Sequence, residues 1–253
     1  MPVEQRNVLM VHLNPCDRLP APWVGFASRS HEPLPNMLVS RPTKFGAGIT
    51  LGGDDLDFES LHETVHYLAA DSGPIAANHF EFALGLAYEF RKAYEGARGK
   101  WLPEVQAYSG YSAINILWPV FLTQLGMLRA ACAYTPTSRR IQSHLFALEA
   151  CAEQALTELD PAVGAMCMRW LSNFSPLPDS FLVEFVTHQA YEFIFGSVQG
   201  KARFRRLPHL LDEISSFSPA YREFDRGITE QAHAQGARRE DFGDWSEWPP
   251  FKW

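Results

Sequence analysis

The stretch Ile49-Thr50-Leu51-Gly52-Gly53-Asp54-Asp55-Leu56-Asp57 marks the point at which the sequence pattern changes from strands to helices. Its first three residues form a short, extended-looking run that ends at two glycines. The aspartates that follow suit the start of a helix, because a carboxylate can cap free N–H groups and favours the positive end of the helix dipole. We therefore predict that a strand ends here and that a helix begins near Leu56.

Residues 1–54 are predicted to be rich in strands. Short apolar and β-branched runs alternate there with turns that contain Pro, Asn, Asp or Gly. The runs lie at residues 8–11, 23–26, 37–39 and 49–51. They predict a small antiparallel or mixed sheet in the N-terminal part of the chain.

Residues 55–236 are predicted to form a predominantly α-helical body. Apolar residues recur at helical spacing behind polar residues that can cap a helix, two of which are followed by a proline suited to the first turn. These starts are Ser138, Asp160-Pro161, Asp179 and Ser218-Pro219. The densely apolar residues 114–128 are short for crossing a bilayer and are predicted to form a buried core helix.

The chain contains no internal repeat and no low-complexity linker that would separate the sheet from the helices. We therefore predict one α+β domain over residues 1–253, in which a small sheet packs against the helical body.

The composition is that of a folded, acidic protein. Of the 253 residues, 46% are hydrophobic and only 20% are charged, which excludes a disordered chain. The net charge of −7 disfavours binding to nucleic acid or to an anionic membrane, because both need a positive protein surface. A basic protein is the partner that this charge favours.

The first residues do not read as a secretory signal, because His12, Asn14 and Pro15 interrupt the apolar run at 8–11. The four cysteines show no paired spacing for a metal site, so we expect them to be reduced and structural. Together these features predict a cytoplasmic protein.

One catalytic signature is present, the string His62-Glu63-Thr64-Val65-His66. Two histidines one helical turn apart can hold a zinc ion, and the glutamate after the first can act as general base on a zinc-bound water. The alternative is an ordinary amphipathic helix, in which both histidines border the apolar face and Glu63 faces solvent.

A catalytic zinc normally takes three protein ligands, and the third is not obvious. In the next helical stretch, residues 76–95, Glu89 lies at a distance that a helix-turn-helix zinc peptidase could use, whereas Glu81 is closer than usual. The metzincin extension is absent, because Ala69 and Ser72 occupy the places of its glycine and its third histidine.

Residues 237–253 form a tail rich in aromatic residues and proline. Such a composition cannot form a helix but can dock its rings, either on its own domain or on a partner. We favour docking on its own domain, because free aromatic tails promote aggregation. The candidate partner-binding residues are Trp245, Trp248, Phe251 and Trp253.

A local basic cluster interrupts the acidic sequence. It consists of Lys201, Arg203, Arg205 and Arg206. It could contact an anion or an acidic partner, but we favour an ordinary solvated loop between helices.

Several runs from residue 37 onward resemble an uncharacterised bacterial domain family of about this length. The runs are residues 42–49, 52–56, 84–96 and 115–119. The resemblance implies no assigned activity. Acidic single-domain proteins of this kind are often immunity or antitoxin partners, an association rather than a physical argument.

Two hypotheses follow. The one that we favour is a non-catalytic cytoplasmic protein that binds another protein, such as a basic toxin or effector, and needs no cofactor. The alternative is a zinc-dependent hydrolase in which His62 and His66 are metal ligands, Glu63 is the general base, and Glu89 or Glu81 completes the site.

Overall fold

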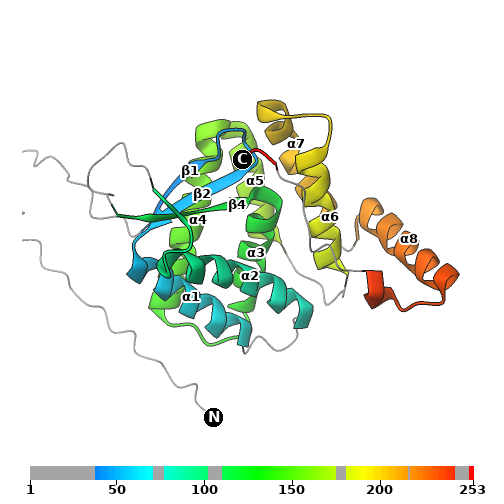
Figure 1. The fold of residues 1–253 in the computed structure, drawn as a ribbon, viewed down its shortest axis with the longest axis horizontal. Helices are drawn as coiled ribbons and strands as arrows, with labels where there is room; N and C mark the ends of the chain where they lie inside the picture. The colour runs from blue at the N-terminus through cyan, green and yellow to red at the C-terminus, as the bar shows by residue number, and fades with distance from the viewer. Residues whose placement is uncertain (1–37, 71–76, 102–109, 175–180, 216, 243–250) are drawn as a thin grey trace, which may run out of the picture. The chain divides into compact units, whose positions relative to one another are not determined.

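The computed structural model describes residues 38–70, 77–101, 110–174, 181–215, 217–242 and 251–253 (Figure 1). Residues 36–253 form one compact unit. The predicted strands at residues 8–11 and 23–26, and the candidate residues Trp245 and Trp248, lie outside the described residues.

The described strands form one antiparallel sheet in the order β1-β2-β4-β3. They are β1 (Leu38–Pro42), β2 (Gly48–Gly53), β3 (Gly99–Lys100) and β4 (Ser112–Leu117). Helices make up most of the rest, so the predicted α+β class, a small sheet with a helical body, is confirmed.

The helices follow the predicted order along the chain. They are α1 (Asp55–Ala70), α2 (Ala77–Tyr94), α3 (Trp118–Ala131), α4 (Arg139–Leu159), α5 (Pro161–Asn173), α6 (Leu182–Phe195), α7 (Gly200–Glu213) and α8 (Pro219–Gln235), with a short 3-10 helix, η2 (Arg239–Phe242). In the part of the chain that the structure describes, no helix is both long and apolar enough to cross a membrane.

Local capping sets several helix starts, as the sequence predicts. Ser138, Asp160 and Ser218 each accept hydrogen bonds from backbone N–H groups in the first turn of α4, α5 and α8. At the strand-to-helix junction, Asp54 Oδ1 accepts from the amide of Asp57, and Asp57 Oδ2 accepts from the amide of Asp54. This reciprocal pair fixes the direction in which α1 leaves the sheet.

The predicted core helix over residues 114–128 is wrong for residues 114–117, which belong to β4. In β4, Ile114 and Ile116 point toward the core and Asn115 points away, which is the alternation of a strand. The helix begins only at Trp118, where Pro119 suits the first turn because it has no N–H to leave unpaired.

The basic cluster at residues 201–206 lies on α7, and the predicted loop there is wrong. Phe204, Leu207 and Leu211 are buried at helical spacing. Burial of this apolar face therefore outweighs the repulsion between neighbouring cations.

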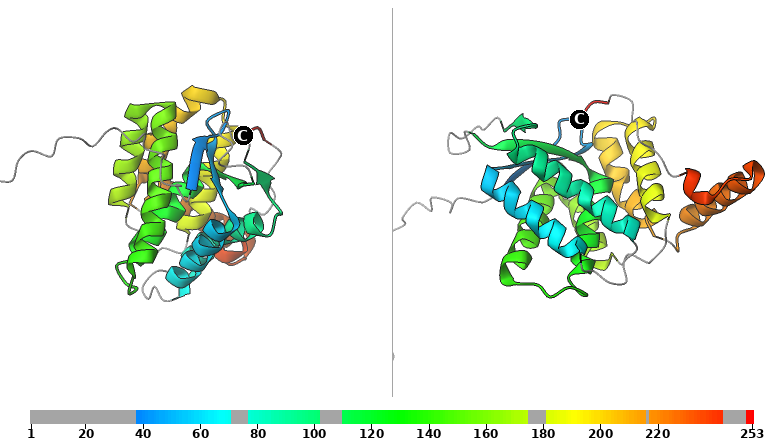
Figure 2. Two further views of the ribbon diagram at one scale, coloured as in Figure 1. Left: turned by 90° about the vertical axis from the view of Figure 1, so that its left-hand side faces the viewer. Right: turned by 60° about the horizontal axis from the view of Figure 1, so that its bottom comes forward.

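The core lies between the inner face of the sheet and the helices. Ile49, Leu51 and Ile114 on that face are at most 1% exposed, and Ser40 Oγ donates to the Cys151 carbonyl of α4 at 2.9 Å. Figure 2 shows α4 and α5 side by side along one side of the strands. A smaller cluster of Phe181, Phe185, Tyr221 and Ile228 attaches α8 to α6.

Candidate functional site

A row of polar side chains crosses the outer face of the sheet. Arg41, Thr50 and Asn115 are direct neighbours on β1, β2 and β4. Because side chains alternate along a strand, all three point away from the core. Thr50 Oγ1 donates a hydrogen bond to Asn115 Oδ1 at 2.7 Å, which fixes the centre of the row.

A groove of about 1120 Å³ lies over this row. Its walls come from α2, the first turns of α3, the β1–β2 turn and β3, and Phe251 and Trp253 line it as well. Figure 1 shows how these segments, far apart in sequence, surround β2 and β4. We refer to this cleft as the sheet groove.

The sheet groove is positively charged although the chain as a whole is acidic. Four cationic side chains line it, Arg41, Lys44, Arg98 and Lys100, with Glu89 as the one carboxylate among the lining residues. Among the described residues, no ion pair involves Arg41, Lys44 or Lys100. These three charges therefore remain available to an anionic ligand.

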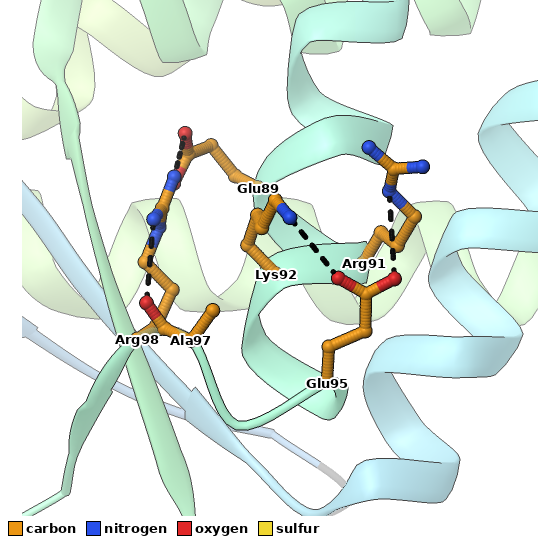
Figure 3. Close-up of polar contacts among 6 residues, drawn as sticks. All are labelled: Glu89, Arg91, Lys92, Glu95, Ala97 and Arg98. Atoms are coloured by element: carbon orange, nitrogen blue, oxygen red, sulfur yellow. Dashed lines mark hydrogen bonds and ion pairs between the residues drawn. The ribbon is translucent and has the colours of Figure 1, made fainter.

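Glu89 pairs with Arg98. The guanidinium of Arg98 donates from Nε to Glu89 Oε2 at 2.7 Å and from Nη2 to Oε1 at 2.8 Å. This bidentate contact raises the pKa of Arg98 above its ordinary value. Figure 3 shows that the neighbouring cations Arg91 and Lys92 pair with Glu95 instead, so that Glu89 is held by Arg98.

Trp101 packs against the sheet next to Arg41 of the sheet groove. A side chain at Gly52 would meet the Trp101 ring, because a Cβ there would lie 2.5 Å from Cε3. The guanidinium of Arg41 lies 4.5 Å from the centroid of the same ring. The absence of a side chain at Gly52 thus lets the indole approach the sheet, where it contacts Arg41.

Gln124 supplies a buried hydrogen-bond acceptor to the groove wall. Its side chain is only 4% exposed, and its Nε2 donates to the Phe82 carbonyl at 2.8 Å. Its Oε1 is buried and has no hydrogen-bond partner among the described residues. A buried acceptor without a donor costs free energy, so this wall of the groove is locally strained in its hydrogen bonding.

Phe251-Lys252-Trp253, which we term the aromatic strap, packs on its own domain. The main-chain oxygen of Trp253 accepts a hydrogen bond from the Phe45 amide at 3.1 Å, and the Phe251 ring meets Phe195 edge to face. Both strap rings pack against the main core. Two of the four aromatic residues assigned to partner binding from the sequence therefore contact this domain.

The string His62-Glu63-Thr64-Val65-His66 lies on α1, on the surface of the helical body. The two histidine rings are 4.4 Å apart, with His62 half-buried and His66 exposed. Burial lowers the pKa of His62, and the positive charges of His66 and Arg91 lower it further. Glu63 is exposed, and its carboxylate lies 4.0 Å from Arg140.

A third metal ligand does not join the two histidines in the described part of the chain, where no three His, Cys, Asp or Glu side chains converge. Glu89 is held by Arg98 in the sheet groove, and Glu81 is exposed on α2. The zinc site stays a prediction that requires a further ligand.

The central residue of the string has an internal role instead. Thr64 is buried, and its hydroxyl lies 2.6 Å from Nδ1 of His144, which is also buried on α4. The contact joins α1 to α4. It shows that one face of α1 packs inward while His66 and Glu63 face solvent.

Of the residues that line the sheet groove, only Glu89, Phe251 and Trp253 were candidate site residues from the sequence, and the role predicted for Glu89 was that of a zinc ligand. The signal for the others was weak: single polar residues, Thr50 and Asn115, at alternating positions of apolar strands. Only the pairing of β2 with β4 shows that these residues are neighbours.

Comparison with known proteins gives a family but no function. Neither a curated protein nor a solved structure matches the sequence significantly. Residues 38–253, which include the whole sheet and all the helices described above, match a family described as a domain of unknown function, DUF6904. The chain therefore belongs to the DUF6904 family.

Proposed function

We propose that this protein is a non-catalytic binding protein whose sheet groove takes an acidic segment of another protein. The observation that carries the proposal is the set of three cations, Arg41, Lys44 and Lys100, that line the groove without an ion pair among the described residues. Such unneutralised cations attract a carboxylate-bearing ligand and orient it on the groove.

A peptide suits the groove better than a small molecule. Its volume of about 1120 Å³ exceeds the usual range of small-molecule sites. The aromatic strap already places one main-chain oxygen, that of Trp253, on the amide of Phe45, next to the groove residue Lys44.

One kind of protein that binds another protein in this way is an immunity or antitoxin protein, which captures a toxin or effector. The net charge of −7 supports a partner that is basic overall, whereas the groove recognises one acidic segment of it. The three described cysteines, Cys132, Cys151 and Cys167, are free thiols, which supports the cytoplasm as the compartment. A bacterial source remains an expectation from the family resemblance.

The test is the fluorescence anisotropy of a labelled hexaglutamate peptide, with hexalysine as the negative probe. We expect wild-type protein to bind hexaglutamate and the double variant R41E/K100E to bind it at least about tenfold more weakly. The matched control is R169E/R222E, which reverses two exposed arginines on α5 and α8 that do not line the groove.

Equal loss of binding in both double variants would show that net charge, not the groove, governs association. Absence of hexaglutamate binding to folded wild-type protein at low ionic strength would refute the acidic-segment proposal.

The second candidate is the zinc hydrolase, which the 4.4 Å separation of the His62 and His66 rings favours. Metal analysis by mass spectrometry of untagged protein tests it. About one zinc per chain, lost in His62→Ala, would support a metal site and make peptidase assays with Glu63→Gln the next step. Metal-free, folded protein that does not take up added zinc would exclude it.

A further inference from the structure

A second cavity, of about 330 Å³, lies between α6 and α7, away from the sheet groove. Its lining from α7 includes Arg203, Arg206 and His209, which follow one another at helical spacing on one side of the helix. We refer to it as the helix pocket.

Arg203 is a buried cation without a counter-ion. Its side chain is 4% exposed, and within the described residues no carboxylate forms an ion pair with it. One guanidinium nitrogen donates to the Phe45 carbonyl at 2.8 Å, and the guanidinium lies 5.3 Å from the centroid of the Phe193 ring. Within the part of the chain that the structure describes, Nε has no hydrogen-bond partner. A charged guanidinium withdrawn from water without a carboxylate is unusual, because buried arginines are almost always paired.

The pocket gathers further positive charge near Arg203. Arg206 lies one turn further along α7, and two cations at this spacing repel each other unless an anion lies between them. Of the two lining carboxylates, Glu213 lies 3.3 Å from His209 and Glu192 is exposed on α6. The arginine pair is therefore not neutralised by the pocket itself.

The loop before α7 forms part of the pocket wall. Residues 196–198, between α6 and α7, line it just before α7 begins. The cap residue of α7, Gln199, makes no side-chain hydrogen bond to the first turn, so the N–H groups there have no side-chain cap. Free N–H groups at a helix N-terminus favour anions, and this N-terminus directly follows the loop that lines the pocket.

We infer that the helix pocket is a binding site for a phosphate-sized oxyanion held by Arg203 and Arg206. The planar guanidinium of arginine matches two oxyanion oxygens at once, which a single lysine cannot do. A pocket of about 330 Å³ admits a free phosphate or the phosphate group of a small phosphomonoester. Burial also lowers the pKa of Arg203, in keeping with a cation that lacks a compensating charge.

Arg206 is the better residue to change, because Arg203 also holds Phe45, whose amide binds the aromatic strap. The matched control on the same helix is Arg205, which is exposed, lies 3.5 Å from Asp160 and does not line the pocket. R206Q and R205Q thus remove the same charge from neighbouring positions.

The experiment is a thermal-unfolding titration of the full chain with potassium phosphate against potassium chloride at matched ionic strength. A ligand that binds only the folded state raises Tm with its concentration. We expect wild-type protein and R205Q to respond alike, and R206Q to need about tenfold more phosphate for the same rise, as for one lost charge-assisted hydrogen bond.

Glycerol phosphate in a parallel titration distinguishes the two sources of the oxyanion. An equal response to both compounds means that the oxyanion alone is recognised, and a stronger response to glycerol phosphate means that the site also reads the attached group; either supports the inference. No phosphate-specific rise in wild-type protein, or equal responses of R206Q and R205Q, would overturn it. R203K, checked for fold by circular dichroism, should also weaken the response, because lysine keeps the charge but loses the planar fork.

Discussion

The two faces of the sheet are built from alternate residues of the same strands, yet one face forms the core and the other lines the sheet groove. On the inner face Ile49, Leu51 and Ile114 are withdrawn from water and form the core. On the outer face Thr50 and Asn115, one residue further along each strand, form the floor of the sheet groove. Because one backbone carries both sets, stability and binding can be separated by substitutions at adjacent positions.

The largest expected effect comes from the inner face. Leu51→Ala removes a fully buried side chain and leaves a cavity, so we expect the free energy of unfolding to fall by about 2–5 kcal/mol. The adjacent outer-face variant Thr50→Ala loses mainly the hydrogen bond to Asn115, which costs about 1 kcal/mol.

Urea unfolding of both variants, combined with hexaglutamate binding to the folded protein, measures the difference. Leu51→Ala should keep its affinity, whereas Thr50→Ala should lose affinity. The reverse ranking of stabilities would show that the two faces do not divide core from site.

The next effect tests how tightly the outer face is closed. In Gly52→Ala the new Cβ meets the Trp101 ring at 2.5 Å and the Val39 side chain at 2.8 Å. Overpacking of this kind costs about 1–3 kcal/mol, and displacement of the indole also releases Arg41, so hexaglutamate binding should weaken.

Gly227→Ala is the matched control, because nothing lies within 4 Å of a Cβ at that position of α8. It should stabilise the protein slightly, since alanine is a better helix residue than glycine. Equal urea midpoints for the two variants would mean that Trp101 does not pack against Gly52 in solution.

The third effect concerns the buried carboxylate of Asp57, in the first turn of α1. Asp57 is 7% exposed beside Gly53, and burial raises its pKa from 3.8 to about 6, although the hydrogen bond from the Asp54 amide lowers it. Between these two values the folded state keeps a proton that the unfolded state has lost. The stability that this proton provides is present below the unfolded pKa and is lost as the pH rises through 6.

Asp57→Asn removes the cost of burying a charged carboxylate, because the amide stays neutral. The amide oxygen can still accept the cap hydrogen bond. We expect a gain of roughly 2 kcal/mol at about pH 7.5 that shrinks toward zero at about pH 4. Urea unfolding at both pH values measures it, with Asp55→Asn, an exposed carboxylate of the same turn, as control. A gain independent of pH would rule out titration of Asp57 as its cause.

Much of the fold could be predicted because its signals are local. The boundary at Gly52-Gly53-Asp54 and the caps Ser138, Asp160 and Ser218 depend on residues within one turn of each other. Strand β4 could not, since Ile114 is extended only because it pairs with Leu51, far away in the sequence. In isolation its apolar residues fit a buried helix equally well.

The candidate site was harder to predict for the same reason. A contiguous motif such as the one on α1 is easy to find, yet its candidate ligands His62 and His66 are not joined by a third among the described residues. The groove residues Arg41, Asn115 and Gln124 have no pattern in the sequence and become neighbours only through strand pairing and helix packing. The net charge was also a poor guide to the site, because cations gather in the sheet groove although the chain as a whole is acidic.

The smallest expected effect comes from Glu89, which has a role in both functional hypotheses. The two hypotheses predict different consequences when its carboxylate is removed. Glu89→Gln breaks a partly exposed ion pair with Arg98, so stability should change by no more than about 1 kcal/mol. If the groove takes an acidic segment, removal of its one lining carboxylate should strengthen hexaglutamate binding by about two- to fivefold, while Glu81→Gln on the same helix should leave it unchanged. If Glu89 is instead a zinc ligand, the same substitution should lower the metal content and should not be mimicked by the groove variant R41E/K100E. A tighter peptide complex and a lost metal cannot both follow from one role of this carboxylate, so measuring both in Glu89→Gln decides between the two functional hypotheses.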